Sequence, residues 1–146
     1  MIAPETVIAQ ARDWCGVRFL HQGRSRFGAD CLGFLAAMMA ELGSMTFIRY
    51  LPANYGRDPQ ALLLEGLANL TREIPLQPGA LVLIQWPHAK HPSHAGIFTG
   101  ENFIHCTQSE GRVLEQGYRG PWVKRTAGVW ALPEVTYLPQ GDSLAI

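Results

Sequence analysis

The spacing of apolar residues divides the chain into a helical first half and a strand-rich second half. Apolar side chains recur at helical intervals in three stretches, which predict helices over Pro4–Trp14, Cys31–Leu42 and Gln60–Leu70. Asp30 and Gly43 are typical of residues that start and stop a helix, so they set the bounds of the second stretch. That stretch is apolar on nearly every side, with Glu41 as its one charged residue, and we therefore expect it at the centre of the fold.

Short apolar runs replace the helical spacing after the turn signal Pro78-Gly79. They predict strands over Ala80–Trp86, His94–Thr99, Phe103–Thr107, Arg112–Glu115 and Gly128–Leu132. The sequence Gly100-Glu101-Asn102 separates the second and third of these, which indicates an antiparallel hairpin. Helices first and strands second predict an α+β fold, with N-terminal helices packed on a central antiparallel β-sheet. The stretch from Ser44 to Arg57 shows no clean period.

Length and composition describe an ordinary folded protein. At 146 residues the chain has room for one compact domain, which we assign to residues 1–138, with residues 139–146 as a short C-terminal tail. Twelve Lys and Arg balance twelve Asp and Glu, which argues against a nucleic-acid partner. The longest uncharged apolar run, Ala80–Trp86, is too short to cross a membrane, and Met1–Arg12 lacks the features of a secretory signal peptide. We therefore expect a chain that is made in the cytoplasm without a signal peptide and has no membrane partner.

Cysteine is the first residue type with candidate chemistry. The chain holds three cysteines without a CxxC motif, a poor basis for a disulfide framework or a structural zinc site. Cys31 follows the predicted N-cap Asp30, where the helix dipole and free backbone N–H groups would lower the pKa of a thiol and hold an oxyanion. The alternative is a core cysteine at the start of an apolar helix. Cys15 and Cys106 are expected to serve packing, with Cys106 facing the core.

Two histidines of the predicted hairpin could serve such a thiol. A neutral imidazole at His94 could take the thiol proton near neutral pH. Gly96, on the same strand face, would leave space above the sheet for a substrate or a helix end. If the hairpin closes over Gly100-Glu101, paired residue numbers sum to 201, so that His105 lies opposite Gly96 and diagonal to His94. The ring of His105 would then orient the ring of His94. The alternative, two unrelated surface histidines, requires a hairpin loop with an odd number of residues.

Four sequence blocks together resemble the NlpC-type family of papain-like cell-wall cysteine peptidases. The blocks are GADCLGF, LQPGALVLI, SHAGIFTGENFIHC and GRVLE, and the matching segments run from about Val7 to Leu132. The resemblance implies that Cys31 is the nucleophile, His94 the general base and His105 the orienting residue. It also implies a helix bearing the cysteine packed against the sheet bearing the histidines. Such enzymes form an acyl-enzyme and cut the bond between D-γ-glutamate and diaminopimelate (or lysine) in peptidoglycan stem peptides.

Some positions depart from the family pattern or add to it. Leu32 stands where the family usually has Ser, and Ala80 where it usually has Asp. Phe19 stands where the family commonly has a Tyr near the substrate-binding end, so a polar contact to substrate is lost. In the loop before the nucleophile, Arg24 and Arg26 are candidates for contact with a stem-peptide carboxylate, the alternative being a solvated loop.

The histidine-rich segment before the second strand invites a metal-site interpretation. His88, His91 and His94 recur at every third residue, but Pro87 and Pro92 disfavour a helix that would align them. No carboxylate in the segment completes a catalytic zinc shell. We therefore expect neither a metal nor a cofactor.

The DCLG form of the cysteine motif resembles the branch of the family found in phage tails and gene transfer agents. That resemblance implies action at the cell wall on a phage-like particle, with tail proteins as partners. Two alternatives remain open at this point. One is a structural tail module that keeps the fold but does not cleave. The other is an acyltransferase that passes the acyl group to an acceptor other than water.

Overall fold

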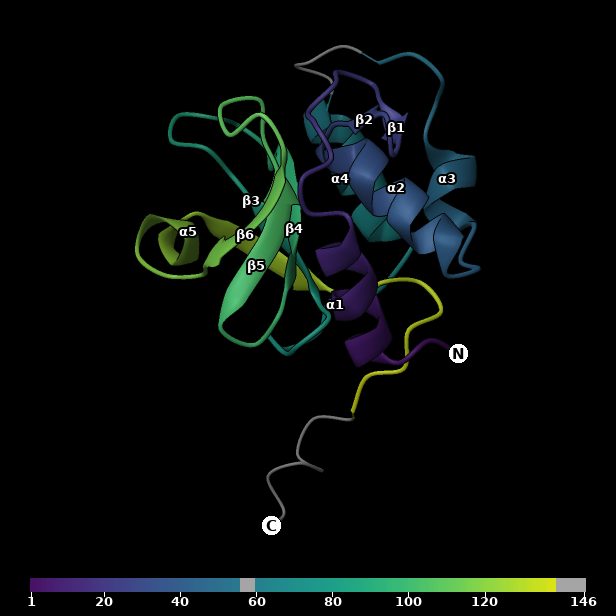
Figure 1. Ribbon diagram of the computed structural model, residues 1–146. Coiled ribbons are helices and arrows are strands. Elements are labelled where there is room, and N and C mark those ends of the chain that lie inside the picture. Colours follow the sequence, from purple (N-terminus) through teal and green to yellow (C-terminus); the bar gives the residue numbers. More distant parts are fainter. Residues whose placement is uncertain (56–59, 139–146) are drawn as a thin grey trace.

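The computed structural model describes residues 1–55 and 60–138 (Figure 1). Its described helices are α1 (Pro4–Asp13), α2 (Cys31–Glu41), α3 (Thr46–Tyr50), α4 (Gln60–Asn69) and α5 (Pro121–Lys124). Its described strands are β1 (Arg24–Ser25), β2 (Gly28–Ala29), β3 (Leu81–Ile84), β4 (His94–Phe98), β5 (Asn102–Cys106), β6 (Val113–Gly117) and β7 (Thr126–Trp130). These elements put a helical half and a strand-rich half in the predicted order.

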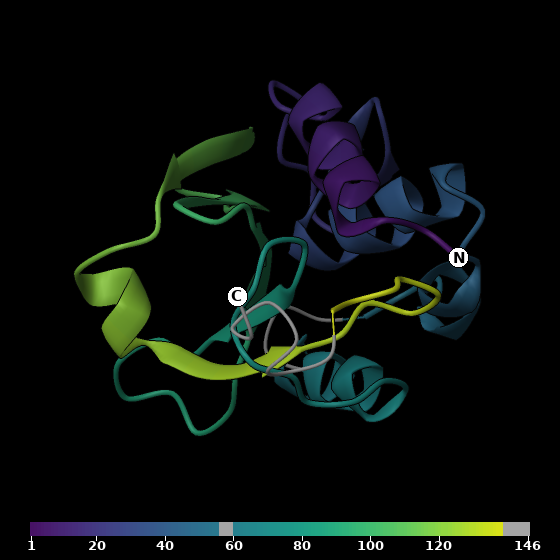
Figure 2. The ribbon, with the colours of Figure 1, turned by 90° about the horizontal axis from the view of Figure 1, so that it is seen from below.

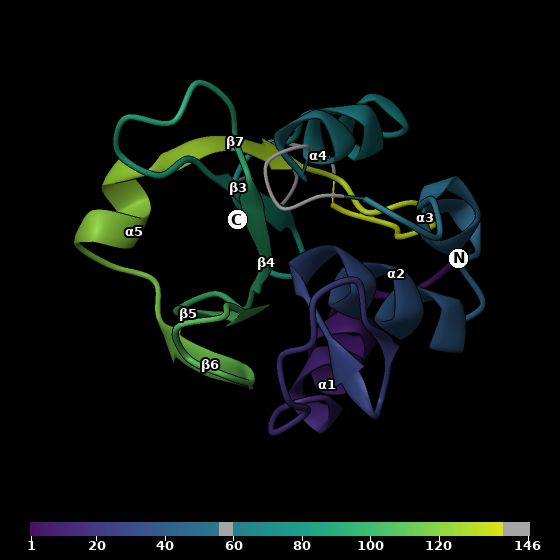
Figure 3. The same ribbon diagram turned by 90° about the horizontal axis from the view of Figure 1, so that it is seen from above.

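One five-stranded sheet organises the fold, in the order β6-β5-β4-β3-β7, and every neighbouring pair in it is antiparallel. Helices α1, α2 and α4 lie on one side of this sheet, and α5 lies on the other (Figures 1 and 3). The sheet curves around the side of α5, which connects the two edge strands β6 and β7 (Figure 2). The predicted α+β class, with N-terminal helices packed on a central antiparallel sheet, is confirmed.

Helix α2 lies at the centre of the core, as its apolar composition predicts. Eight of its eleven residues are buried, from Cys31 to Met39, and it packs against α1, α3, β4 and β5. Phe34 meets the ring of Trp14 edge-on, with 5.8 Å between the ring centroids. Each large apolar side chain buried in this way stabilises the fold by about 1.5–3 kcal/mol. The start of the helix is therefore held rigidly against the sheet.

The short elements are the ones that sequence patterns missed. The hairpin of β1 and β2 lies in the segment expected to be a polar loop, and α3 lies in the stretch without a clean period. Helix α3 has five residues and no side-chain cap of its own. Distant groups hold its start instead, because Ser44 and Thr46 both donate hydrogen bonds to the carboxylate of Glu134. Elements this short cannot display a period, and the contacts that hold the start of α3 are remote in sequence.

The hairpin of β4 and β5 has the predicted register. Gly96 pairs with His105, Ile97 with Ile104, and Phe98 with Phe103. The turn closes over Gly100 and Glu101 through a 2.9 Å hydrogen bond from the Thr99 N–H to the Asn102 carbonyl. Gly100 adopts φ +117°, a backbone region that favours glycine. A two-residue turn keeps His94 and His105 on one face of the sheet.

The C-terminal tail predicted for residues 139–146 lies outside the described residues, so the domain boundary stays a prediction. No helix in the described ranges is both long enough and apolar enough to traverse a bilayer.

Candidate active site

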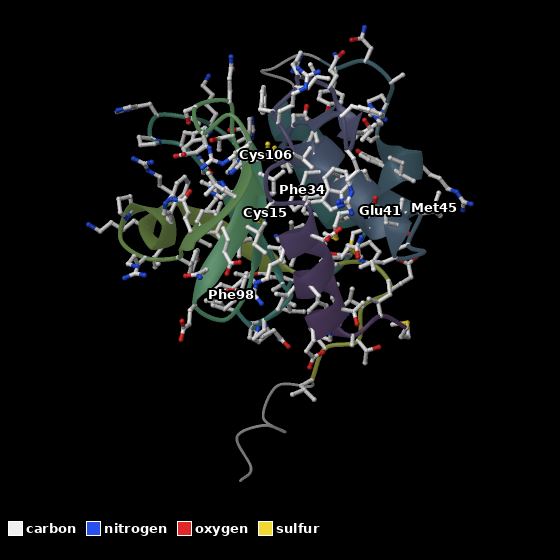
Figure 4. All side chains as sticks on the ribbon, in the orientation of Figure 1. Cys15, Phe34, Glu41, Met45, Phe98 and Cys106 are labelled. Atoms are coloured by element: carbon white, nitrogen blue, oxygen red, sulfur yellow. The ribbon has the colours of Figure 1, made fainter. Side chains whose placement is uncertain are left out.

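A cavity of about 260 Å³ brings Cys31 and His94 to one place. Cys31 is the first residue of α2, and His94 is the first residue of β4. The other lining residues come from the loop before α2, the ends of β3 and β5 and the segments that follow: Phe19, His21, Asp30, Trp86, Ser93, Cys106, Thr107, Gln108 and Ser109. Figure 4 shows Cys106 on the side of the sheet that faces the helices, and its thiol donates to the Ala29 carbonyl at 3.3 Å. The cavity therefore lies between the start of α2 and the ends of β4 and β5.

Asp30 caps α2 from a fully buried position. One carboxylate oxygen, Oδ1, accepts a 2.8 Å hydrogen bond from the Gly33 N–H. The other, Oδ2, accepts from the Gln22 N–H at 2.9 Å and from the Tyr55 hydroxyl at 2.6 Å. The predicted N-cap role is confirmed. Because three donors satisfy this carboxylate, it fixes the backbone that carries Cys31.

The electrostatic environment of Cys31 differs from the sequence prediction. We expected the helix N-terminus to lower the pKa of the thiol, but burial and the charge of Asp30 raise that pKa well above its ordinary value. Backbone N–H groups of Ala95 and Leu32 favour the thiolate and only partly offset this effect. A thiol that is 3% exposed loses most of the hydration that would stabilise its anion. The hydrogen bond from the Ala95 N–H places the Cys31 sulfur beside β4. Ala95 directly follows His94 in the sequence.

His94 and His105 form a buried pair on the sheet. His94 Nε2 and His105 Nδ1 lie 2.7 Å apart, and His105 Nε2 lies 2.5 Å from Gln116 Oε1. His94 is 3% exposed and His105 is fully buried, so the alternative of two unrelated surface histidines is wrong. Burial lowers the pKa of both imidazoles. The two rings are therefore neutral near pH 7 and share one hydrogen bond.

Aromatic rings hold the two imidazoles in place. Trp86 stacks on His94 with 5.4 Å between ring centroids, and Phe103 stacks on His105 at 4.1 Å. Trp122 meets His105 edge-on at 5.1 Å and also contacts Trp86. These contacts leave the imidazoles little freedom to rotate and surround them with groups that carry no charge. Trp86 has a second role, because it also lines the cavity.

The expectation that Gly96 leaves room for a substrate is wrong. A Cβ atom at this position would lie 2.9 Å from the Ile104 carbonyl oxygen and 3.0 Å from the His105 Cβ. Those contacts belong to the neighbouring strand, and Gly96 is not among the residues that line the cavity. The missing side chain instead permits the close approach of β5 that brings His105 beside His94.

Phe19 is the one predicted substrate-contact residue that lines the cavity, where it is half-buried. Arg24 and Arg26 do not line it. Arg24 donates to the carbonyl oxygens of Leu51 and Pro52. Arg26 forms ion pairs with Asp13 and Glu41 and lies over the Trp14 ring. The prediction that these guanidinium groups contact the substrate is corrected, because both are used to hold the protein's own chain.

The remaining candidate residues separate from the site. His91 pairs with Glu65 at 3.0 Å between Nδ1 and Oε1, whereas His94 pairs with His105, so the regularly spaced histidines have different partners. Cys15 was expected to serve packing, yet it is exposed. Cys106 is buried, as expected, although it also lines the cavity.

Sequence reasoning missed Gln116 and Tyr55, whereas it placed Trp86 in the core or in the wall of the cleft, and Trp86 does line the cavity. Gln116 lies on β6, where the register pairs it with Phe103 and pairs Leu114 with His105. Because residues 114 and 116 share a face with His105, the alternation of strand side chains could have found Gln116 once that register was known. The segment between β5 and β6 carries no two-residue turn signal that would reveal the register.

Comparison with known proteins identifies the family. The chain matches the NlpC/P60 family over residues 16–131, a range that includes Cys31, His94 and His105. The chain belongs to the NlpC/P60 family. It is 27% identical over 120 residues to the murein DD-endopeptidase MepS/murein LD-carboxypeptidase of Escherichia coli strain K12. The match covers 82% of this chain and 57% of that protein, so the chain spans little more than half of this curated relative.

Solved structures show the same NlpC/P60, papain-like fold. An NlpC/P60 family protein from Bacillus cereus superposes with a TM-score of 0.65 at 22% identity, over 93% of this chain and 40% of that one. The NlpC/P60 domain of the peptidoglycan hydrolase SagA gives 0.62 at 16% identity, over 88% and 98% of the two chains. RipB, a peptidoglycan hydrolase of Mycobacterium tuberculosis, gives 0.59 at 18% identity, over 88% and 63%.

Proposed function

We propose that this NlpC/P60 domain is a cysteine peptidase that hydrolyses amide bonds in peptidoglycan stem peptides. The observation that carries the proposal is the meeting of Cys31 and His94 in one cavity, with His105 hydrogen-bonded behind His94. The names of the relatives support the substrate class, because they include a murein endopeptidase and peptidoglycan hydrolases. A purely structural module has no need of a thiol, an imidazole and a second imidazole in this order.

The proposed reaction proceeds through an acyl-enzyme. The Cys31 sulfur attacks the amide carbonyl carbon while its proton passes to His94, and the oxyanion of the tetrahedral intermediate is held by backbone N–H groups at the start of α2. The C–N bond then breaks as His94 gives the proton to the leaving amine. Water, deprotonated by His94, attacks the thioester, and collapse of the second intermediate releases the acid and restores the Cys31 thiol.

The electrostatics favour an uncharged resting pair. The pKa of the Cys31 thiol is raised and that of His94 is lowered, so the proton stays on sulfur until attack. In such a pair His94 acts as a general base in the attack step, rather than as the cation of a preformed ion pair. The His105 ring keeps His94 oriented and shares the positive charge that forms on it.

We propose the bond between D-γ-glutamate and diaminopimelate or lysine as the one that is cut. The family resemblance supports this choice. The E. coli relative is named for two other activities, DD-endopeptidase and LD-carboxypeptidase. A test must therefore offer all three kinds of bond to the enzyme.

Mass spectrometry of purified muropeptides provides that test. Wild-type protein is incubated with disaccharide tripeptide, tetrapeptide and cross-linked dimers, and the products identify the broken bond. Cys31→Ala is expected to abolish every product, whereas Cys15→Ala, which removes an exposed thiol that is not part of the cavity lining, is expected to keep full activity. Cleavage by Cys31→Ala at the wild-type rate would refute the proposal. Including an amine acceptor separates hydrolysis from acyl transfer, which would yield an acylated amine instead of a free acid.

Action at the cell wall on a phage-like particle is a further part of the proposal. Its support is the resemblance of Asp30-Cys31-Leu32-Gly33 to the motif of phage-tail and gene-transfer-agent peptidases. Antibody detection of the protein in purified particles from the producing cells is the expected result. Its presence only in the soluble fraction would contradict this mode of delivery while leaving the peptidase activity unaffected.

A further inference from the structure

The side chain of Gln116 lies at the end of a chain of hydrogen bonds that leads to the cavity. Its Oε1 is 2.5 Å from His105 Nε2, and His105 Nδ1 is 2.7 Å from His94 Nε2. An amide oxygen has lone pairs and no hydrogen, so the proton in the first contact belongs to His105 Nε2.

A neutral imidazole carries one N–H, so a proton on His105 Nε2 leaves His105 Nδ1 bare. The bare nitrogen can only accept, and the proton in the 2.7 Å contact therefore belongs to His94 Nε2. His94 is neutral as well, so its Nδ1 is bare. The Nδ1 atom is then the nitrogen of His94 that can take the Cys31 proton. These proton assignments require both imidazoles to be neutral, and the burial of both rings supports the neutral forms.

The opposite arrangement would disable the base. If His105 carried its proton on Nδ1, it would donate to His94 Nε2, and the proton of His94 would then occupy Nδ1. The nitrogen needed for the thiol would be blocked. We propose that Gln116 is a positioning residue that selects the productive tautomer of both histidines through the carbonyl oxygen of its amide, an inference that rests on the proposed function.

The surroundings of His105 give this role to Gln116 among the described residues. Phe103 stacks on one face of the ring and Trp122 meets it edge-on, and neither accepts a conventional hydrogen bond. Glu110 acts on the ring through its charge but makes no hydrogen bond with it among the described contacts. Gln116 does not line the cavity, so its substitution leaves direct substrate contacts intact.

Nitrogen NMR of protein labelled with ¹⁵N-histidine tests the proposal without substrate. In the wild type, His94 and His105 are both expected to show a protonated Nε2 and a bare Nδ1. Gln116→Met keeps the length of the side chain and removes the acceptor, so we expect signals from both tautomers of His105. Gln116→Glu keeps an acceptor, so we expect the wild-type tautomers. Glu115→Gln, on the opposite face of the same strand, is the matched control and should leave both rings unchanged.

Kinetics provide a second readout. Loss of one neutral hydrogen bond should lower kcat roughly two- to tenfold in Gln116→Met, with KM unchanged. Gln116→Glu should retain kcat on the alkaline side, and its acid limb should move to higher pH because the carboxylate raises the pKa of His105. A merely structural role would instead make the two variants equally defective.

The outcomes separate this proposal from the proposed function. A bare His105 Nε2 in the wild type, which would mean that the Gln116 amide donates, would overturn it. Unchanged tautomers in a folded Gln116→Met protein would do the same. Wild-type protein that shows the expected tautomers but cleaves no muropeptide would refute the peptidase activity, while the tautomer assignment would stand.

Discussion

The helix side and the sheet side of the cavity hold their chemistry in different ways. On the helix side, the buried carboxylate of Asp30 accepts hydrogen bonds from Gly33, Gln22 and Tyr55 and so fixes the start of α2. On the sheet side, His94 and His105 bond to each other, and aromatic rings enclose them. The charged carboxylate of Asp30 stabilises the helix side, whereas the aromatic rings that contact the two histidines on the sheet side are neutral.

This difference shows that structural stability and thiol reactivity are opposed on the helix side. The carboxylate that caps α2 also raises the pKa of the neighbouring Cys31 thiol. On the sheet side no such conflict arises, since burial lowers the pKa of His94 and keeps it available as a base. In the proposed reaction, the sheet side therefore accepts the proton that the helix side does not release spontaneously.

Removing the base from the sheet side should have the largest effect. We expect His94→Gln to lower kcat/KM for stem-peptide cleavage by roughly 10²- to 10⁴-fold, the range of general base catalysis. The matched control is His91→Gln, which removes a histidine three residues away that pairs with Glu65 outside the cavity lining. Steady-state assays with one muropeptide compare the two. A His94→Gln enzyme within tenfold of the wild type would mean that another group takes the thiol proton.

The parts of the site that could be predicted from sequence are those determined by local geometry. Asp30 and Cys31 are adjacent, so a helix start places the cap and the thiol together without further information. The histidine pair depends on one turn, and Gly100-Glu101 is a recognisable two-residue hairpin connection whose even length puts both rings on one face. A turn signal thus converts a separation of eleven residues into a contact.

The parts that could not be predicted depend on partners remote in sequence. The raised pKa of Cys31 follows from burial, which a helix-terminus argument does not include. Arg26 finds Glu41 and Asp13, and Arg24 finds carbonyl oxygens at residues 51 and 52, so neither is available where a loop argument places it. Predicting that Gln116 lies beside His105 requires the register between β5 and β6, and the segment between these strands carries no two-residue turn signal.

A substitution on the helix side should sharpen the comparison by making the thiol more reactive. Burial and, after it, the charge of Asp30 raise the pKa of Cys31. Asp30→Asn removes the second of these causes, so we expect iodoacetamide to label Cys31 several-fold faster at pH 8. The amide nitrogen cannot accept from Gln22 and Tyr55, and the variant should lose about 1–3 kcal/mol of folding free energy.

Both measurements belong in a Cys15→Ser background, because the exposed Cys15 would otherwise dominate the labelling. Tyr55→Phe is the matched control, since it deletes one hydrogen bond to Asp30 and keeps the charge. It should be destabilised without faster labelling of Cys31. Equal labelling rates in Asp30→Asn and Tyr55→Phe would show that the charge of Asp30 does not control the thiol.

Acid should weaken the fold through the sheet side. The folded-state pKa values of His94 and His105 lie below the ordinary value of 6.5, so the unfolded chain binds protons that the folded chain excludes. Stability is therefore full above pH 6.5 and falls as the pH drops below it. Urea unfolding at pH 7.5 and 5.5 measures the loss. His94→Gln should reduce the difference, and an unchanged difference would place the titration elsewhere.

The smallest expected effect lies outside the cavity, in the contact between α1, α2 and the β1–β2 hairpin. Arg26, Trp14 and Gln10 all donate hydrogen bonds to the Glu41 carboxylate. The Arg26 contact is the largest cause that lowers the pKa of Glu41 from 4.5 to about 2. Its stabilisation is therefore complete above pH 4.5 and is lost as the pH falls toward 2. Because the side chain is 35% exposed, solvent screening limits the contribution to about 1 kcal/mol or less.

At pH 6, Glu41→Gln should lower the free energy of unfolding by about 1 kcal/mol or less. It should also lose less stability than the wild type loses between pH 4.5 and 2. The histidine effect begins below pH 6.5, above this window, and both proteins share it, so the difference between Glu41→Gln and the wild type at each acid pH isolates the contribution of Glu41. Glu65→Gln, which removes a carboxylate paired with the exposed His91, is the control and should leave the acid window unchanged. If Glu41→Gln and the wild type lose stability in parallel below pH 4.5, the network around Glu41 does not stabilise the packing of α2, and the rigidity of the Cys31 helix must come from its apolar contacts and from the Asp30 cap.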